Sequence, residues 1–228
     1  MIKFVFLDLD ETLLDFHRAE AVGLEKTLSD FGVACDEAVK SRFSVINLAQ
    51  WKRLERGELT RAEVKLRRFE ILLEELGVVR DAEAIRVRYE EYLSTGHYFL
   101  PGAEALLDAL WGKYKLYIAS NGTTAVQQGR IKSANIARYF DAIFFSEDMG
   151  YVKPQREFFD ACFKTIPEFD RTQAIILGDS LTSDIQGGIN ARIKTCWFNP
   201  HGAEHNGDPT PDFEIRTLAE FTELVESL

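Results

Sequence analysis

The chain has 228 residues, enough for one large hydrophobic core or for one core with a smaller companion domain. Its formal net charge of -10 argues against a nucleic-acid backbone or an anionic membrane surface as partner, because both are negative. The cysteines Cys35, Cys162 and Cys196 are widely spaced and form no C-x-x-C pair, which favours free thiols. Acidic residues stand where a signal peptide would be apolar, and no stretch is apolar enough to span a bilayer. We therefore expect a cytoplasmic protein.

The first predicted element is a buried strand that ends at two carboxylates. The apolar run that begins at Lys3 is rich in Phe and Val, as is typical of a strand inside a parallel sheet. Asp8 and Asp10 are two residues apart, so both should project to the same side where the strand leaves the sheet. Two like charges there are costly unless a cation or a reaction requires them. The pattern predicts a metal-assisted carboxylate site.

Residues 16–95 show helical patterns and no convincing strand. Thr60 followed by Glu63 forms a candidate capping box, and the charged run that ends at Arg68 is interpreted as a solvated helix face of mixed sign. The predicted helices are 19–31, 38–51, 61–76 and 82–93. We interpret residues 16–95 as a helical domain inserted into an α/β core formed by residues 1–15 and 96–228.

Strands and helices alternate after residue 103, which predicts βαβ units and a parallel sheet. Helical spacing occurs at 103–110 and at 155–164. The predicted strands are 115–120, 142–146, 174–179 and 195–199, with a further edge strand at 213–216. The fold class is therefore α/β, with a parallel sheet and an inserted helical domain.

Three further segments place polar side chains where the predicted strands end. They are Ser120-Asn121-Gly122-Thr123, Lys153-Pro154, and Gly178-Asp179-Ser180 followed by Asp184. Taken singly, the serine and the aspartates could be helix caps, and the lysine a surface charge. In a parallel sheet, however, all these strand ends meet at one edge, where open α/β sheets bind ligands.

Together these groups fit a phosphoryl-transfer reaction whose substrate is a small-molecule phosphate. Mg²⁺ prefers a few carboxylates, waters and a substrate phosphate over a full protein cage. An aspartate can serve as the nucleophile of a covalent phosphoryl intermediate, while a second carboxylate protonates the leaving oxygen and later deprotonates water. Positioning and charge neutralisation supply most of the remaining catalysis.

The four segments, in this order, resemble the haloacid dehalogenase-like (HAD) hydrolase superfamily over essentially the whole chain. The resemblance implies a Rossmann-like catalytic core with a C1-type helical cap. It implies that Asp8 is the nucleophile and Asp10 the general acid/base. It also implies that Mg²⁺ is held by Asp8, the backbone carbonyl of Asp10, and Asp179. The second aspartate separates the chain from the dehalogenase branch, which lacks it.

The resemblance assigns the remaining polar residues to the phosphate and to the surroundings of the metal. Ser120 and Lys153 would bind the phosphoryl group, with Asn121 close to it. Asp184 would orient Lys153 or a metal-bound water. Glu11 stands where the commonest form of the first motif has glycine, which bears on specificity more than on catalysis.

Within the superfamily the chain is most similar to pyrimidine 5′-nucleotidases, on Asp8 to Leu14, on Ser120-Asn121-Gly122, and on Gly187 to Ala191 with the Thr195-Cys196-Trp197 that follows. The implied activity is Mg²⁺-dependent hydrolysis of nucleoside 5′-monophosphates, pyrimidine or non-standard, through an aspartyl-phosphate. Phosphatases for small sugar phosphates or phosphoglycolate, and phosphomutases, share these motifs and stay open as alternatives. Both a monomer and a homodimer are compatible with the sequence.

Three aromatic residues of the predicted helical domain are candidates for stacking on a nucleotide base. They are Phe16, Phe43 and Trp51. Aromatic residues in a helical domain more often form its core, so for each of them a packing role is the first expectation.

Overall fold

The computed structural model describes residues 1–205 and 207–228, and it divides into two compact units. One consists of Met1–Asp15, Tyr98–Thr124 and Ala134–Leu228, and the other of Phe16–His97 and Ala125–Ser133. The division differs from the one expected from sequence mainly at residues 125–133, which join the helical unit. No helix among the described residues is long and apolar enough to cross a membrane.

The first unit is built on a six-stranded sheet, in which every neighbouring pair of strands is parallel. The spatial order of the strands is β3-β2-β1-β4-β5-β6. The strands are β1 (Phe4–Leu7), β2 (Lys115–Ser120), β3 (Ala142–Phe145), β4 (Ala174–Gly178), β5 (Lys194–Phe198) and β6 (Phe213–Ile215). The α/β class predicted from sequence is confirmed, and the five strands predicted after residue 103 agree with β2 to β6 within one residue at each end.

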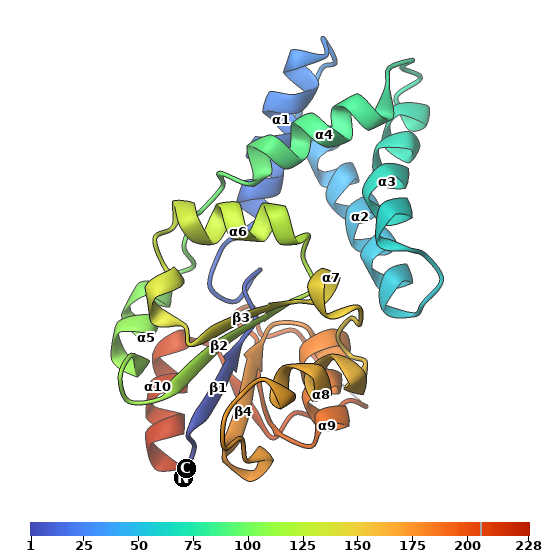
Figure 1. Ribbon diagram of the computed structural model, residues 1–228. Coiled ribbons are helices and arrows are strands. Elements are labelled where there is room, and N and C mark those ends of the chain that lie inside the picture. The colour runs from blue at the N-terminus through green and yellow to red at the C-terminus, as the bar shows by residue number, and fades with distance from the viewer. Residues whose placement is uncertain (206) are drawn as a thin grey trace. The chain divides into compact units, whose positions relative to one another are not determined.

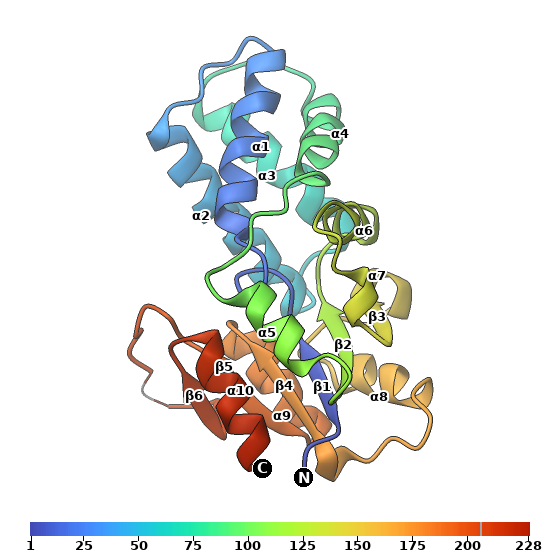
Figure 2. The ribbon, with the colours of Figure 1, turned by 90° about the vertical axis from the view of Figure 1, so that its left-hand side faces the viewer.

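Helices cover both faces of this sheet (Figures 1 and 2). On one face lie α8 (Arg156–Lys164) and α9 (Gln186–Ala191), and on the other lie α5 (Ala103–Leu110) and α10 (Leu218–Ser227). The β1 residues Phe4 and Phe6 belong to the core beneath α8. Because successive strand residues point to opposite faces, a strand covered on both sides must be apolar throughout, and all four residues of β1 are buried.

Short elements connect the strands of the sheet to these helices. A 3-10 turn and helix α7 stand on either side of β3, and another 3-10 turn precedes β4. A π-helical turn between β4 and α9 was not predicted from the sequence. These elements are η1 (Ala137–Tyr139), α7 (Ser146–Met149), η2 (Arg171–Gln173) and η3 (Leu181–Ile185).

The second unit consists of four helices together with most of a fifth. They are α1 (Phe16–Asp30), α2 (Glu37–Glu55), α3 (Arg61–Glu75), α4 (Ala82–Leu93) and residues 125–133 of α6 (Thr124–Ser133). The rings of Phe43, Phe69 and Tyr89 pack against one another, with centroids 5.1–5.6 Å apart. The predicted capping box at the start of α3 is confirmed, with Thr60 and Glu63 bonded in both directions.

Close backbone contacts hold α6 to the chain segment that follows α4. The Arg130 Nε donates to the carbonyl of Gly96 at 2.8 Å, and a Cβ on Gly129 would lie 2.7 Å from the Ser94 carbonyl oxygen. Glycine at position 129 is therefore required for this approach, because a real side chain would collide with backbone.

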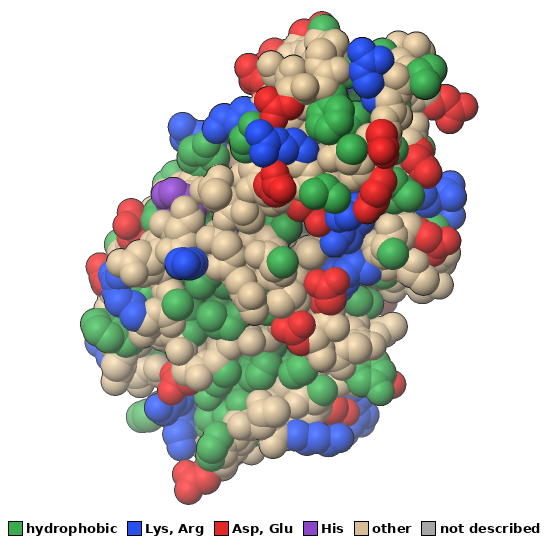
Figure 3. All heavy atoms as spheres, turned by 45° about the horizontal axis from the view of Figure 1, so that its top comes forward, with side chains coloured by type: hydrophobic (Ala, Val, Ile, Leu, Met, Phe, Trp, Pro, Cys, Tyr) green, Lys and Arg blue, Asp and Glu red, His purple; other side chains and the backbone are tan. Residues whose placement is uncertain are grey.

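The surface of the helical unit mixes acidic and basic side chains (Figure 3). Glu90, for example, pairs with Lys65 at 3.0 Å and with Arg86 at 2.7 Å. The interpretation of the charged run that ends at Arg68 as a solvated face was wrong for Arg68 itself, which is buried. Arg68 lies i+4 from Val64, on the apolar stripe of α3 that faces the core.

Candidate active site

The centre of the α/β unit's polar edge is a buried lysine between two buried aspartates. Lys153 Nζ lies 2.6 Å from Asp8 Oδ1 and 2.6 Å from Asp184 Oδ1, and it also donates to the carbonyl of Ala119 at 2.5 Å. Only 1% of Lys153 is exposed. All three donor positions of the ammonium are thus directed to oxygen atoms, which fixes the lysine and the Asp8 carboxylate together.

Burial and neighbouring charge shift the pKa values of these groups. Burial raises the pKa of Asp8 to about 7, Lys153 opposes this shift, and the Asp184 and Asp10 charges add to it. Burial alone would lower the pKa of Lys153, but the Asp184 and Asp8 carboxylates reverse the effect and raise it. The lysine therefore remains a cation. The ionised form of Asp8, in contrast, costs free energy in this buried site.

The π-helical turn η3 brings Asp184 back onto the end of β4. Its Oδ2 accepts the Ser180 N–H at 3.1 Å, and its carboxyl lies directly against Gly178. A Cβ on Gly178 would stand 2.3 Å from the Asp184 Cγ, so only glycine fits there. Gly178 thus leaves the space that the Asp184 carboxylate occupies at this strand end.

Three carboxylates form a group that could hold a metal ion. Asp8, Asp179 and Asp184 offer oxygen atoms that all lie within 4.8 Å of one another. Burial raises the pKa of Asp179 well above its usual range, with contributions from the Asp184 and Asp8 charges. Clustered carboxylate oxygens that resist ionisation without a counter-charge suit a hard divalent cation such as Mg²⁺.

Asp10 lies in the tight turn that follows β1, and its side chain is outside this group of three carboxylates. The turn is closed by hydrogen bonds from the Leu13 N–H to the Leu9 carbonyl at 3.0 Å and from the Glu11 N–H to the Leu14 carbonyl at 2.9 Å. Glu11 has φ of 55°, in the left-handed region that favours glycine. Glycine adopts such a φ without strain, which explains why the commonest form of this motif has glycine after the second aspartate. This chain has a glutamate in that conformation.

Ser120 and Asn121 end β2 beside the lysine. Ser120 is buried, and its Oγ accepts the Gly122 N–H at 3.1 Å. Asn121 binds the lysine's backbone twice: its Nδ2 donates to the Lys153 carbonyl and its Oδ1 accepts the Lys153 N–H, both at 2.9 Å. Lys153 lies in a turn in which the Gln155 N–H donates to the Val152 carbonyl at 2.7 Å.

Asn190 supports the same turn from α9, a contact that the sequence did not predict. Its Nδ2 donates to the Pro154 carbonyl at 2.9 Å. A Cβ on Gly187, one turn earlier in α9, would lie 2.7 Å from the Phe159 ring of α8, so this glycine allows the two helices to approach. The only signal in the sequence is the run from Gly187 to Ala191, which carries a family likeness but does not by itself indicate a contact with Pro154.

The aromatic candidates of the helical unit separate into core and partly exposed residues. Phe43 is fully buried and belongs to the core. Phe16 is half-buried, with the Arg130 guanidinium 5.6 Å from its ring centroid. Trp51 is also half-buried: its Nε1 donates to Asn47 Oδ1 at 3.0 Å, and the Arg61 guanidinium lies 5.5 Å from its ring.

The parallel sheet, with buried carboxylates and a lysine at its carboxyl edge, defines an α/β enzyme that acts at its strand ends. The chain belongs to the haloacid dehalogenase-like hydrolases, whose family model matches residues 2–192. The predicted superfamily is thereby confirmed, and together with the nucleotidase relatives described next the match confirms the prediction of a phosphatase-type hydrolase.

Proteins of similar sequence span nearly the whole chain. Pyrimidine 5′-nucleotidase PynA of Streptococcus pneumoniae is 38% identical over 225 residues, covering 98% of this chain and 95% of the relative. Pyrimidine 5′-nucleotidase YjjG of Escherichia coli is 31% identical over 222 residues, with 97% of each chain covered. The HAD-hydrolase YfnB of Bacillus subtilis, whose crystal structure has magnesium bound, matches with a TM-score of 0.93 and 36% identity over 98% of both chains.

Proposed function

We propose that this chain is a Mg²⁺-dependent phosphatase that hydrolyses nucleoside 5′-monophosphates, with pyrimidine nucleotides preferred, through an aspartyl-phosphate on Asp8. The observation that carries the chemistry is the buried contact of Lys153 with both Asp8 and Asp184, beside Asp179. In this proposal the α/β unit is the catalytic core and the helical unit is the cap domain. The cytoplasmic location remains a prediction from the sequence.

The choice of substrate rests on the relatives. Two proteins that match this chain along nearly its full length, at 38% and 31% identity, are pyrimidine 5′-nucleotidases. Fold alone does not identify a substrate, since one fold hosts many activities. The likeness in sequence covers both the catalytic strand ends and the helical insertion, and it therefore supports the same substrate class here.

In the first step Asp8 attacks the phosphorus atom. A carboxylate oxygen of Asp8 forms a bond to phosphorus as the bond to the nucleoside 5′ oxygen breaks. Lys153 holds Oδ1 of Asp8 at 2.6 Å, so the other carboxylate oxygen, which attacks, has a fixed direction. The protonated carboxyl of Asp10 gives its proton to the departing 5′ oxygen, which leaves as the nucleoside hydroxyl.

In the second step the phosphoryl group passes to water. Asp10, now ionised, takes a proton from a water molecule, and the water oxygen attacks the phosphorus of the aspartyl-phosphate. Asp8 is regenerated as a carboxylate and inorganic phosphate leaves. The Ser120 hydroxyl binds a phosphoryl oxygen, and the ammonium of Lys153 does so by exchanging one of its carboxylate contacts for the phosphoryl group, while Asn121 positions the lysine through its backbone.

The carboxylates of Asp8 and Asp179, with the backbone carbonyl of Asp10, would hold the Mg²⁺ ion. When bound, the ion supplies positive charge that neutralises the phosphate oxygens and allows two anions to approach. Asp184 lies 2.6 Å from Lys153 and within the same group of carboxylates, so in this proposal it orients the lysine or a water on the ion.

The test is inorganic phosphate release from a panel of phosphomonoesters, with Mg²⁺ and with excess chelator. The panel pairs pyrimidine and purine 5′-monophosphates with sugar phosphates and phosphoglycolate. We expect metal-dependent turnover led by pyrimidine nucleotides, and loss of turnover on the order of 10⁴-fold in Asp8→Asn. Glu157→Gln is the matched control, because it makes the same kind of change, carboxylate to amide, on an exposed position of α8.

Three outcomes would change the proposal in different ways. Turnover led by sugar phosphates or phosphoglycolate would keep the mechanism and replace the substrate. Phosphoryl transfer within a sugar, without release of phosphate, would identify a phosphomutase. Full activity of Asp8→Asn would overturn the aspartyl-phosphate mechanism itself.

A further inference from the structure

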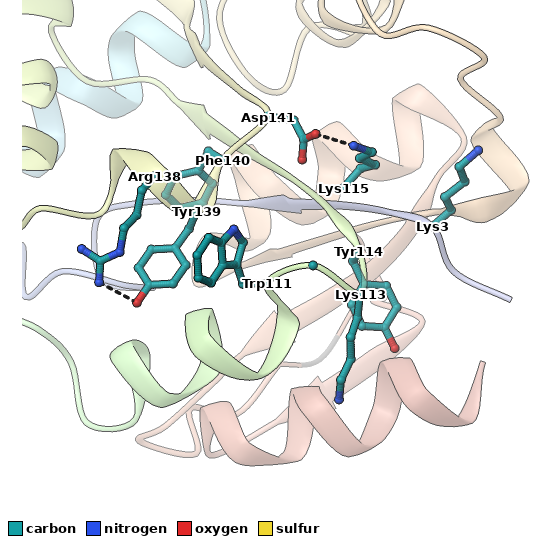
Figure 4. A pocket seen from close by; sticks show the side chains of 10 residues that line it. Lys3, Trp111, Lys113, Tyr114, Lys115, Arg138, Tyr139, Phe140 and Asp141 are labelled. Carbon is teal, nitrogen blue, oxygen red and sulfur yellow. Dashed lines mark hydrogen bonds and ion pairs between the residues drawn. The ribbon is translucent and has the colours of Figure 1, made fainter.

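A pocket lies at the amino end of the sheet, at the opposite ends of the strands from Asp8. Its volume is about 330 Å³, within the size range of small-molecule pockets. Figure 4 shows its lining side chains, which come from the starts of β1 and β2, the turn before β2 and the segment before β3. Those used below are Lys3, Trp111, Lys115, Arg138, Tyr139 and Asp141.

The charged residues that line this pocket are four basic and one acidic, Lys3, Lys113, Lys115 and Arg138 against Asp141. The whole chain has the opposite balance, with 37 acidic and 27 basic residues. The register explains how two of the lysines come together, because the Lys115 N–H donates to the Lys3 carbonyl at 2.9 Å across neighbouring strands. A local excess of positive charge on an acidic protein attracts anionic ligands to that place.

The cations of the pocket are compensated only in part. Lys115 Nζ pairs with Asp141 Oδ1 at 2.8 Å, and Lys113 pairs with Glu226 at 2.9 Å. The Arg138 guanidinium donates to the Asn135 carbonyl and to the Tyr139 hydroxyl, both uncharged acceptors. Among the described residues no ion pair of Lys3 is found; its ammonium lies 5.3 Å from the Phe4 ring. Exposed ion pairs such as Lys115–Asp141 are weak enough for an anion to compete.

An exposed indole lines the same pocket (Figure 4). Trp111 is 56% exposed, although large aromatic side chains are usually covered. It follows α5 in a turn with Gly112 at φ of 74°, and its edge meets the Tyr139 ring, with centroids 5.5 Å apart at 77°. Tyr139 is held in turn by Asp108, because its hydroxyl donates a hydrogen bond to Asp108 Oδ1 at 2.5 Å. The indole is therefore fixed from one side by a bound tyrosine, with much of its surface left in solvent.

We propose that this pocket binds a nucleoside polyphosphate as a second ligand, separate from the substrate of the strand-end site. The base stacks on Trp111, and the phosphates contact Lys3 and Lys115, which lie together to one side of the indole (Figure 4). A flat ring next to several cations is the combination that nucleotides recognise, since every base has a face for stacking and phosphates seek lysine and arginine. The proposal does not depend on which phosphomonoester the enzyme hydrolyses.

The test is equilibrium binding of ATP and CTP by calorimetry, in excess chelator, to the Asp8→Asn protein. We expect saturable binding that falls by about tenfold or more in Lys3→Gln/Lys115→Gln and in Trp111→Ala. Lys164→Gln, an exposed lysine of α8, is the matched control and should bind as the parent does. Hydrogen exchange on the unmodified chain locates the ligand, with protection expected at residues 111–115 and 138–141.

Two further probes separate the parts of the ligand. Pyrophosphate should bind more weakly than the triphosphates and be indifferent to Trp111→Ala, and the uncharged nucleosides should not bind measurably. The proposal is overturned if nucleotides protect only the strand-end site, or if the lysine and tryptophan variants bind as tightly as the parent. It is also overturned if pyrophosphate binds as tightly as ATP, because the ring would then contribute nothing. Circular dichroism checks that the variants fold, so that lost binding reports the pocket.

Discussion

Each unit of the molecule buries charged side chains, and the two groups are built differently. In the α/β unit Lys153 touches Asp8 and Asp184 directly, at 2.6 Å each, with Asp179 beside them. In the helical unit Glu20 and Arg68 do not pair directly. Asn47 joins them, donating to Glu20 at 2.7 Å and accepting from Arg68 at 2.9 Å.

The charge balance of the two groups also differs. When Asp8, Asp179 and Asp184 are all ionised, three negative charges face the one positive charge of Lys153, so this group keeps two negative charges, which a divalent cation would cancel. In the helical unit one glutamate faces one arginine, whose guanidinium lies 4.9–5.9 Å from the centroids of three aromatic rings. We infer that the first group is unbalanced because it must bind a ligand, whereas the second is balanced because it only has to fold.

The largest expected effect comes from removing the lysine of the unbalanced group. Lys153→Met leaves Asp8 and Asp184 without their shared cation, so turnover should fall on the order of 10³-fold. The free energy of unfolding should fall by about 3 kcal/mol, since broken buried pairs leave an uncompensated charge. Steady-state kinetics and urea unfolding measure the two effects. Lys164→Met is the exposed control, and turnover within threefold of the parent in Lys153→Met would contradict the assignment.

The balanced group should respond in stability and not in chemistry. Asn47→Leu removes the amide between Glu20 and Arg68 while keeping a similar volume, which should destabilise folding by about 2–3 kcal/mol. Turnover of a small substrate without a base should change less than about threefold, because no reacting atom is involved. Gln128→Leu makes a similar change on an exposed position of α6 and should leave both the stability and the turnover unchanged. Lost turnover without lost stability in Asn47→Leu would break the distinction between the two groups.

A third measurement uses the pH dependence of the unbalanced group. Burial raises the pKa of Asp8 from 3.8 to about 7 in the protein without metal. Between those values the folded state holds a proton that the unfolded state has lost, so this carboxyl lowers the free energy of unfolding as pH rises.

Metal binding requires the ionised carboxylates, and it should therefore stabilise more at higher pH. With Mg²⁺ at about 100 times its Kd we expect the unfolding temperature to rise by about 5–10 °C at about pH 8. At about pH 5 the rise should be much smaller. Asp179→Asn should abolish most of it, whereas Glu157→Gln should not. Equal rises at both pH values would show that these carboxylates do not take up the metal.

Much of the fold follows from local patterns in the sequence. Strands β2 to β5 are recognisable because their apolar, largely buried runs show no polar alternation and end at polar residues. The start of α3 is predictable because Thr60 and Glu63 satisfy each other's backbone groups within four residues. The rule that parallel strands end at a common edge also explains why the sequence alone places Asp8, Ser120 and Asp179 together.

What the sequence did not reveal depends on contacts between distant segments. The π-helical turn that returns Asp184 to Gly178 has no local signal, because the Asp184 side chain fits only in the space that the missing Cβ of Gly178 leaves. Asn121 stays a predicted neighbour of the phosphate, and the sequence did not reveal that both ends of its amide bind the backbone of a residue 32 positions later. The burial of Arg68 needed the three rings around it, which come from three different helices.

The smallest expected effect concerns Glu11, which lies next to Asp10 in the tight turn that follows β1. Glu11 has φ of 55°, which costs a residue with a Cβ about 1 kcal/mol, whereas glycine adopts it freely. Glu11→Gly should therefore raise the free energy of unfolding slightly, by about 0.5 kcal/mol, because glycine's greater freedom when unfolded offsets part of the gain. Urea unfolding resolves the change when Glu157→Gly, in a helix, serves as the opposite control and loses stability. The Glu11 charge lies close enough to act on Asp179, so Glu11→Gly removes one negative charge from the surroundings of the metal site, and the affinity for Mg²⁺ should weaken by no more than about twofold. A clear loss of stability in Glu11→Gly would mean that the glutamate side chain, and not the turn, stabilises this end of β1.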